Sequence, residues 1–332
     1  MTFDLEEAQL IKEIDQRKAK RVLIQLPEGL KTEGCRLAAI AEKAGAVAIV
    51  SADPCYGACD MATIEAEILG ADLILHYGHT EMIRENGVPI VYVEARANVD
   101  VKDVIMKALP YFDRWKSIGL TTTVQHVHAL DEAKKLLLDA GKVVAIGNAG
   151  RLKYAGQVIG CDYSNAKSVA KDIEAFLFIG GGRFHAIGLA LATSKPTVVA
   201  DPYEKRAYEV DVLVERVLKQ RWASICEAQN AKNFGILIGL KSGQIRIEKA
   251  LELKSALEMS GRKAVLLAVR EETPEIIMQF PSIDAFINTA CPRISLDDAS
   301  RFSKPVILPN ETLVVLRRMT WEELCKRGWF ES

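Results

Sequence analysis

Four of the seven cysteines stand in loops that follow apolar, strand-like runs of the sequence. Cys55 and Cys59 follow one such run, Cys161 lies after a second and Cys291 after a third. In open α/β sheets, ligands gather at the carboxyl ends of the strands, where these loops would lie. A thiolate in such a loop can act as a nucleophile, a redox partner or a metal ligand. The cysteine pattern therefore predicts a thiol site at the edges of one or more sheets.

Three of these thiols would need a metal if they met at one point. Three thiolates facing each other repel strongly unless a cation neutralises them. Three thiolates with a free fourth corner fit either a zinc site or an iron–sulfur cluster with one open iron. The usual Cys-x-x-Cys zinc pair is absent, since three residues separate Cys55 from Cys59. Scattered, unrelated thiols remain the alternative.

The elements that must position these loops are short apolar strands alternating with helical segments. Such continuous apolar strands are typical of parallel sheets covered on both faces. Glycines at positions 45, 141 and 261 follow three of the expected helices as stop signals. The expected strands are Arg21–Leu26, Ala46–Val50, Asp72–His76, Pro89–Val93, Gly119–Val124, Lys142–Ile146, Phe176–Ile179, Thr197–Ala200, Phe234–Leu240, Ala264–Val269, Ala285–Asn288 and Val306–Leu308. An amphipathic helix is expected over Thr2–Lys18, and a solvated linking helix over Lys205–Arg221.

The order of strand, polar loop, short helix, proline and strand occurs three times along the chain. A repeat of this length indicates repeated domains rather than a solenoid, whose repeats run to about 20–50 residues. The expected domains are 1–105, 106–210 and 211–332, and they carry one loop cysteine each: Cys59, Cys161 and Cys291. The predicted fold class is α/β, with three homologous flavodoxin-like or Rossmann-like parallel-sheet domains in a pseudo-threefold triangle.

Composition excludes several classes of protein. The 332 residues are 49% hydrophobic and 26% charged, as in an ordinary globular protein, and the net charge of −1 gives no broad basic surface for nucleic acid. No apolar run approaches the ~20 residues of a membrane helix, and residues 1–20 are too charged for a signal peptide. We expect a cytoplasmic protein in which Cys35, Cys226 and Cys325 are buried structural residues.

Six motifs together give the chain a resemblance to the archaeal diphthamide-synthesis family, an atypical class of radical S-adenosylmethionine enzymes. The resemblance covers nearly the whole chain, and the motifs are specific only in combination. They are LPEGL at Leu26–Leu30, DPCYGACD at Asp53–Asp60, VIGCDYS at Val158–Ser164, FIGGGRFHAIG at Phe178–Gly188, ADPY at Ala200–Tyr203 and ACPR at Ala290–Arg293.

The resemblance implies a cofactor, a reaction and partners. Family members bind one 4Fe-4S cluster through one cysteine from each of three domains, which places the ligands at Cys59, Cys161 and Cys291. They transfer the 3-amino-3-carboxypropyl group of S-adenosylmethionine to C2 of a histidine of translation elongation factor two. The reduced cluster cleaves the Cγ–S bond, and methylthioadenosine is released. An electron donor and a homodimer are implied as well.

The chain departs from the family pattern beside its first ligand. The metal-binding cysteine after Tyr-Gly is often followed by another cysteine in the family, whereas Asp60 follows Cys59 here. Cys55 lies four residues before the matched position, and we interpret it as a neighbour and not a ligand. His76 and His79 occupy the equivalent loop of another strand, and we expect them to be hydrogen-bonding residues rather than ligands.

Contacts with S-adenosylmethionine are expected from a glycine loop and its neighbours. Three successive glycines before a helix can offer backbone amides to a carboxylate, or can simply form a tight turn. Positively charged side chains beside them could add charge-assisted bonds. An acidic residue at the end of the first strand faces the cleft or caps the next helix. The candidates are Gly180, Gly181, Gly182, Arg183, His185 and Glu28.

Two other functions fit the same cysteine pattern. The chain also resembles quinolinate synthase, a pseudo-threefold enzyme with one cluster cysteine per domain that performs a dehydrative condensation. A zinc-stabilised binding module without catalytic activity is the second alternative. Release of methylthioadenosine would distinguish the diphthamide-synthesis function from the first alternative, and metal analysis would distinguish it from the second.

Overall fold

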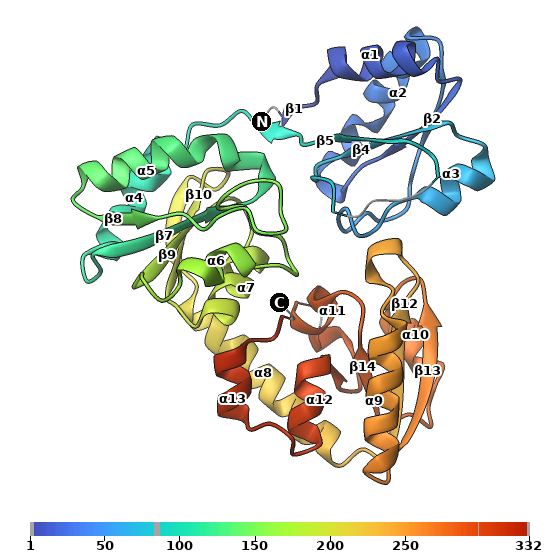
Figure 1. Ribbon diagram of the computed structural model, residues 1–332, viewed down its shortest axis with the longest axis vertical. Helices are drawn as coiled ribbons and strands as arrows, with labels where there is room; N and C mark the ends of the chain where they lie inside the picture. The colour runs from blue at the N-terminus through green and yellow to red at the C-terminus, as the bar shows by residue number, and fades with distance from the viewer. Residues whose placement is uncertain (1–2, 83–86, 298, 331–332) are drawn as a thin grey trace.

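The computed structural model describes residues 3–82, 87–297 and 299–330 as an α/β protein (Figure 1). Its strands are β1 (Phe3–Asp4), β2 (Arg21–Gln25), β3 (Val47–Val50), β4 (Leu73–Tyr77), β5 (Ile90–Val93), β6 (Arg96–Ala97), β7 (Ser117–Thr122), β8 (Val143–Ala145), β9 (Ala175–Ile179), β10 (Thr197–Asp201), β11 (Arg206–Glu209), β12 (Asn233–Gly239), β13 (Lys263–Val269), β14 (Ala285–Asn288) and β15 (Val306–Ile307).

The helices fill the segments between the strands. The α-helices are α1 (Glu7–Arg17), α2 (Gly34–Lys43), α3 (Thr63–Leu69), α4 (Lys102–Ala108), α5 (Leu130–Asp139), α6 (Ser164–Val169), α7 (Phe184–Thr193), α8 (Asp211–Gln229), α9 (Ile247–Met259), α10 (Pro274–Met278), α11 (Pro292–Leu296), α12 (Pro309–Val315) and α13 (Trp321–Arg327). The 3-10 helices are η1 (Glu28–Glu33), η2 (Leu109–Phe112), η3 (Val124–Ala129), η4 (Ser242–Gln244) and η5 (Ala299–Arg301).

Three sheets repeat one strand order. We call the parts of the chain that carry these sheets the first, second and third regions. The sheet of the first region has the order β3-β2-β4-β5, that of the second has β8-β7-β9-β10 and that of the third has β13-β12-β14-β15, with every pair parallel. Among the described residues, the second sheet alone carries a further strand, β11, which pairs antiparallel with β10. Figure 1 shows the three regions grouped around a common centre. The predicted parallel α/β fold is therefore confirmed, and the recurring order puts equivalent loops at equivalent sheet edges.

The apolar core is shared unequally among the regions. The first region buries its own cluster, which includes Leu23 in β2 and Ile74 in β4. One continuous cluster joins the second and third regions and runs from Phe176 in β9 to Phe234 and Ile236 in β12. Burial of such side chains stabilises a fold by roughly 25 cal/mol per Å² of apolar surface. The second and third regions are thus joined by core packing, while the first region has a separate core.

The glycine stop signals are confirmed, while the first helix starts later than expected. Gly45, Gly141 and Gly261 all have positive φ directly after a helix, as their role as stop signals requires. The helix expected over Thr2–Lys18 begins only at Glu7, because Phe3–Asp4 forms β1 and pairs with β6. Thr2 lies outside the described residues.

The segment Lys205–Arg221 was wrongly expected to be a solvated helix. It contains the edge strand β11 and the first half of α8, and Arg221 is fully buried. The Arg221 guanidinium donates to Glu311 Oε1 at 2.8 Å and to the Ser295 carbonyl at 2.7 Å. A buried arginine of this kind is tolerated because a carboxylate and carbonyls satisfy its donors.

Cysteines outside the loops are less buried than expected. Cys35 is exposed on α2, and Cys226 and Cys325 are half-buried. The core-facing side of α2 is formed by Leu37 and Ala41, and position 35 points away from it. The prediction of buried cysteine is wrong for Cys35. Within the described ranges, no helix combines the length and the hydropathy needed to cross a membrane.

Candidate active site

The loop after β3 carries Cys59 and is held by the third region. The Gly243 N–H donates to the Cys59 carbonyl at 2.9 Å, and the Gln244 amide donates to Cys59 Sγ at 3.4 Å. A Cβ on Gly243 would lie 2.5 Å from the Cys59 Cα, so only glycine allows this approach. A backbone contact between two regions therefore fixes the first loop cysteine.

A tight turn in the second region presents Cys161. Ile159 and Asp162 exchange backbone hydrogen bonds of 3.3 and 3.2 Å, which leaves Gly160 and Cys161 at the tip. A Cβ on Gly160 would lie 2.3 Å from the ring of Phe184, the first residue of α7. The aromatic ring and the glycine thus set the position of the turn together.

Cys291 follows β14 and precedes α11 in the third region. The Asn288 side chain donates to the Cys291 carbonyl at 2.7 Å. The Arg293 guanidinium lies 5.2 Å from the centre of the Phe184 ring, within the range of a cation–π contact. Phe184 therefore contacts the loop of the second cysteine and a residue beside the third.

The three loop thiols affect one another's ionisation. Burial, with smaller effects from the charges of Cys59 and Cys291, raises the pKa of Cys161 to about 12. Burial, with a smaller effect from Cys59, also raises the pKa of Cys291 to about 12. The pKa of Cys59 is raised by burial against the opposing hydrogen bond from Gln244. Three half-buried thiols of this kind become thiolates only when a cation neutralises them.

The three sulfurs do not lie as close together as the ligands of one zinc ion. A tetrahedral zinc with bonds of about 2.3 Å to sulfur brings its sulfurs to roughly 3.8 Å from each other. Among the described residues, Cys59, Cys161 and Cys291 form no group whose ligand atoms all lie within 4.8 Å. A four-iron cluster separates its cysteine ligands more widely, and the donor set of three thiols fits it.

The glycine loop at the carboxyl end of β9 opens α7. The Gly180 N–H donates to the Ala200 carbonyl at 3.1 Å, so this amide is already engaged in the structure. A Cβ on Gly181 would lie 2.5 Å from the Tyr203 ring, and Gly182 has a φ of 78° with open space around it. The loop requires glycine at two positions for backbone reasons, whether or not it binds a ligand.

Two of the candidate residues for S-adenosylmethionine, Arg183 and His185, lie at the start of α7 in the second region. His185 is half-buried, and its ring stacks at 6.1 Å on Phe178. Burial, with smaller effects from Arg293 and His79, lowers its pKa to about 4. Arg183 is exposed at the start of α7.

Glu28 begins η1 at the carboxyl end of β2. Its carboxylate Oε1 accepts the Cys55 N–H at 3.1 Å. The side chain therefore holds the cysteine loop of the first region and does not only cap its own helix.

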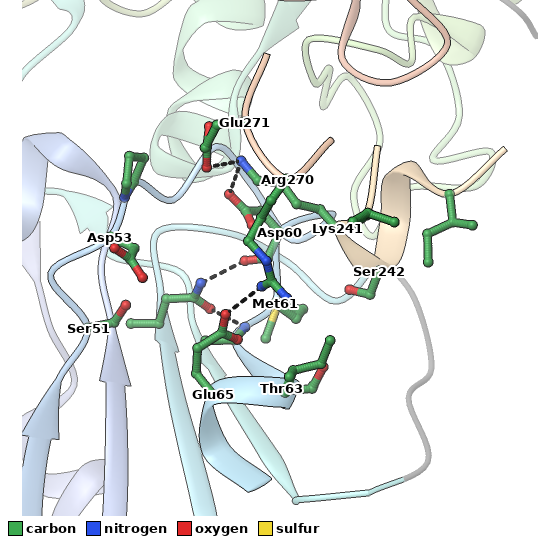
Figure 2. Close-up of a pocket in the computed structure, with 16 residues that line it drawn as sticks. Ser51, Asp53, Asp60, Met61, Thr63, Glu65, Lys241, Ser242, Arg270 and Glu271 are labelled. Atoms are coloured by element: carbon green, nitrogen blue, oxygen red, sulfur yellow. Dashed lines mark hydrogen bonds and ion pairs between the residues drawn. The ribbon is translucent and has the colours of Figure 1, made fainter. Parts of the chain in front are cut away.

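A separate charged pocket lies between the first and third regions (Figure 2). Lys241 Nζ lies 3.2 Å from Asp60 and 2.7 Å from Glu271, and Arg270 lies 2.7 Å from Glu65. None of the three loop cysteines lines it. The ion pairs hold the two regions together beside the Cys59 loop.

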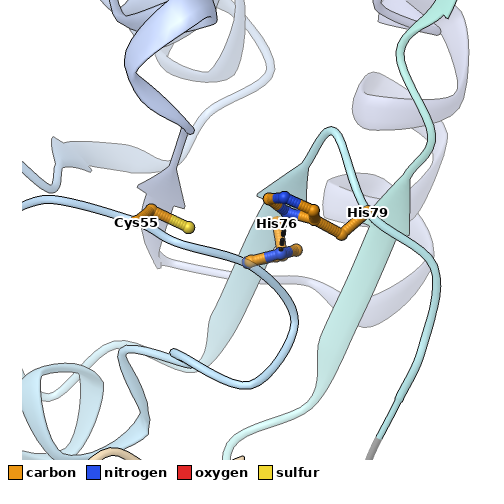
Figure 3. Close-up of side chains that lie close together, drawn as sticks. All are labelled: Cys55, His76 and His79. Carbon is orange, nitrogen blue, oxygen red and sulfur yellow. Dashed lines mark hydrogen bonds between the residues drawn. The ribbon is translucent and has the colours of Figure 1, made fainter. Parts of the chain in front are cut away.

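Cys55, His76 and His79 form a cluster that sequence reasoning did not predict (Figure 3). Their ligand atoms all lie within 4.8 Å of one another. The expected hydrogen bonding of the histidines is confirmed, since His76 Nε2 lies 3.0 Å from His79 Nδ1. The spacing of the two histidines at the end of one strand was visible in the sequence, but the approach of Cys55 was not.

A comparison with known protein families shows which family the chain belongs to. The sequence profile of the family described as "Putative diphthamide synthesis protein" matches residues 26–325. The chain belongs to the diphthamide synthesis family. The family resemblance predicted from the six motifs is confirmed.

Individual relatives agree with the diphthamide synthesis family. A 2-(3-amino-3-carboxypropyl)histidine synthase of Pyrococcus horikoshii is 38% identical over 95% of this chain and 91% of its own length. A 2-(3-amino-3-carboxypropyl)histidine synthase subunit 1 of Gallus gallus is 32% identical over 99% of this chain and 81% of its own length. The crystal structure of Dph2 from Pyrococcus horikoshii with a 4Fe-4S cluster matches with a TM-score of 0.90 and 36% identity, covering 100% of this chain and 94% of that one.

Proposed function

We propose that this protein is a 2-(3-amino-3-carboxypropyl)histidine synthase, a transferase that acts in the first step of diphthamide biosynthesis. It transfers the 3-amino-3-carboxypropyl group of S-adenosylmethionine to a histidine of translation elongation factor two. Full-length similarity to a synthase of this name and to a relative's structure with a 4Fe-4S cluster supports the proposal. The observation that carries it is a set of contacts between the three loops, in which Gly243 binds the Cys59 backbone and Phe184 lies against Gly160 and Arg293.

We propose Cys59, Cys161 and Cys291 as the ligands of one 4Fe-4S cluster. Each thiol has a pKa raised by burial, and neighbouring thiols add to this effect at Cys161 and Cys291. Bound iron would relieve this repulsion, because thiolates are the usual ligands of such clusters. When bound and reduced, the cluster supplies the electron that cleaves the Cγ–S bond and releases methylthioadenosine.

The polar residues of the site would orient the methionyl end of S-adenosylmethionine. We assign its carboxylate to Gly181, Gly182 and the exposed guanidinium of Arg183, which stand at the start of α7. Gly180 would shape the turn, because its N–H already donates to a carbonyl. His185, neutral through its lowered pKa, would face the methionyl amine or the incoming imidazole without adding charge. Glu28 would hold the Cys55–Cys59 loop by accepting the Cys55 N–H.

We further propose that the three regions are repeats related by a pseudo-threefold axis, with domain bounds near 1–105, 106–210 and 211–332. The shared strand order supports the repeat. Cysteine loops at equivalent sheet edges would then converge on the axis. We also propose a homodimer, an external electron donor and a cytoplasmic location, where elongation factor two acts.

An anaerobic assay tests the function and the ligands together. The purified, reduced protein should release methylthioadenosine from S-adenosylmethionine and modify the elongation factor, as mass spectrometry of both products would show. Cys59→Ala, Cys161→Ala and Cys291→Ala should each lose the iron and at least about a thousandfold of activity, since a reactive metal centre supplies most of a rate enhancement. Cys35→Ala, at an exposed site, is the matched control.

Two results would contradict the proposal. An iron-free protein that still transfers the group would remove the cluster from the reaction. Equal tolerance of all four cysteine changes would refute the ligand assignment.

A further inference from the structure

Cys55, His76 and His79 bring three potential metal ligands together inside the first region (Figure 3). Cys55 shares its loop with Cys59, but none of the three proposed cluster ligands belongs to this group. Cys55 and His76 are buried, with 1% and 0% of their surfaces exposed. A thiol and two imidazoles are the donor types that Zn²⁺ prefers. Buried polar groups need partners, and Cys55 Sγ has only a long contact of 4.0 Å to the Gly57 carbonyl.

The tautomer of His76 follows from the hydrogen bonds of Gln25. The Ala62 N–H can only donate, so the atom of Gln25 that it meets at 3.3 Å is the amide oxygen. The same oxygen lies 2.9 Å from His76 Nδ1, which must therefore carry the hydrogen. The Gln25 amide nitrogen donates in turn to the Asp60 carbonyl at 2.7 Å. A neutral His76 thus directs the bare lone pair of Nε2 toward His79.

This arrangement is the one that metal-ligating histidines adopt. A ligating histidine donates its second ring N–H to an oxygen, which fixes the ring and its tautomer. Gln25 and His76 are register partners on the adjacent strands β2 and β4, so the pair is built into the sheet. The acceptor is thus supplied by a strand and not by a flexible loop.

The separations suit one metal ion. Zinc bonds of about 2.0 Å to nitrogen place two tetrahedral ligands roughly 3.3 Å apart. His76 Nε2 and His79 Nδ1 are 3.0 Å apart, so a small rotation of one ring would open the space. Cys55 Sγ lies within 4.8 Å of one ring nitrogen of each histidine.

We propose that Cys55, His76 and His79 form a second metal site, for a zinc-type divalent cation, distinct from the cluster site of Cys59, Cys161 and Cys291. Three protein ligands leave a fourth position for water or a carboxylate. The carboxylate of Glu28, which accepts the Cys55 N–H at 3.1 Å, is the candidate for that position. The ion would fix the loop that carries Cys59. The proposal does not depend on the transferase activity.

Zinc uptake by the holoenzyme tests this site. Anaerobically prepared protein with its iron content verified would be loaded with ZnCl₂ and passed over a weak chelator. We expect one zinc ion per chain to remain. Zinc K-edge X-ray absorption, which does not register iron, should show one sulfur neighbour at about 2.3 Å and nitrogen neighbours at about 2.0 Å. Cys55→Ser should lose the sulfur neighbour, and His79→Gln should weaken zinc binding at least about tenfold.

Matched controls and opposing results keep the test decisive. Cys35→Ser and His128→Gln change exposed residues of the same types and should bind zinc like the wild type. Circular dichroism and iron content establish that the variants fold. If Cys55→Ser does not fold, His79→Gln alone tests the zinc site. Absence of retained zinc in the wild type would overturn the proposal. So would two or more sulfur neighbours, which would place zinc at the cluster loops, or an unchanged spectrum in Cys55→Ser.

Discussion

At the scale of single residues, the positions of the cysteines depend on neighbours with little or no side chain. Gly243 brings the backbone of the third region against the backbone of Cys59, and Gly160 gives the Cys161 turn its contact with Phe184. In both places a Cβ would overlap atoms that hold a candidate ligand. Glycine is therefore part of the site, although it offers no ligand atom.

Gly243→Ala should displace the Cys59 loop. The new Cβ would lie 2.5 Å from the Cys59 Cα and 2.6 Å from its Cβ, so the loop or η4 must move. We expect a loss of about 1–3 kcal/mol in the free energy of unfolding, which is typical of overpacking, and less iron per chain. Urea denaturation and iron analysis measure both effects.

Gly29→Ala is the control for this change, because no atom lies within 4 Å of its added Cβ. Equal iron content in Gly243→Ala and Gly29→Ala would show that the backbone contact does not position Cys59.

His126 should make the protein less stable in acid. Burial lowers its pKa to about 4, with a smaller effect from His128, while an unfolded histidine titrates near 6.5. The unfolded state therefore binds more protons below pH ~6.5, and stability falls as the pH drops toward 4. At about pH 5.5 the loss from this residue is roughly 1.4 kcal/mol. Denaturant titrations at neutral and acid pH should show a smaller pH effect in His126→Asn.

His128→Asn should keep most of the pH effect, since burial is the main cause of the lowered pKa of His126 and His128 is exposed. A pH dependence equal in the wild type and His126→Asn would exclude His126 as a source of the acid sensitivity.

At the scale of elements, the apolar runs predicted the strands because a parallel strand is buried on both faces. Asn233–Gly239, for example, is buried at six successive positions, and such a run differs clearly from a helix or a loop. The loop positions of Cys59, Cys161 and Cys291 followed from the strand ends. The cluster of Cys55 with His76 and His79 did not follow, because it depends on β2 standing between β3 and β4, and local sequence does not specify that order.

The burial of Arg221 in α8 could not be predicted, because the segment is rich in charged residues. Arg221 and its charged neighbours resemble a solvated surface, yet the guanidinium is paired with Glu311 ninety residues later in the chain. Such a long-range ion pair leaves no periodic pattern. The exposure of Cys35 was missed for a related reason, since one turn of helix places a cysteine on either face.

Arg221→Met should strongly destabilise the third region. It would leave the Glu311 carboxylate, fully buried, without its cation, although Trp329 Nε1 still donates to it at 2.8 Å. Breaking a buried pair from one side costs about 3–5 kcal/mol. Arg221→Met combined with Glu311→Leu should recover much of the loss, as thermal denaturation would show.

Lys219→Met is the matched control on the same helix. Its ion pair with Glu215 spans 3.9 Å and both side chains are exposed, so the expected change is within about 1 kcal/mol. A loss in Arg221→Met no larger than in Lys219→Met would show that the buried pair contributes little.

At the scale of the whole molecule, the three regions are attached by different means. The second and third share one apolar core, whereas the first meets the third through ion pairs such as Lys241–Asp60 and Arg270–Glu65. It also meets the second through polar contacts, including Lys153–Glu94 at 2.6 Å. Polar interfaces are the usual boundary along which domains move.

Removing the cluster should loosen the first region selectively. A ligand that binds only the assembled site stabilises it, and three ligands from three regions would make the cluster a cross-link. Hydrogen exchange should rise at Gly243 and around Cys59 after iron chelation, while β9 and β12 in the shared core stay protected. An equal rise in hydrogen exchange across all three sheets would contradict the prediction that the first region loosens selectively.

The dispersal of the three thiols along the chain has a consequence for biosynthesis. Cys59 is made early, but its loop is held by Gly243 and Gln244, and its last partner, Cys291, follows β14 of the third region. A nascent chain that ends before that strand offers at most two of the three thiols, although it already contains the residues that hold the Cys59 loop. On the proposed ligand set, complete ligation of the cluster can therefore begin only after Cys291 has been made, late in translation.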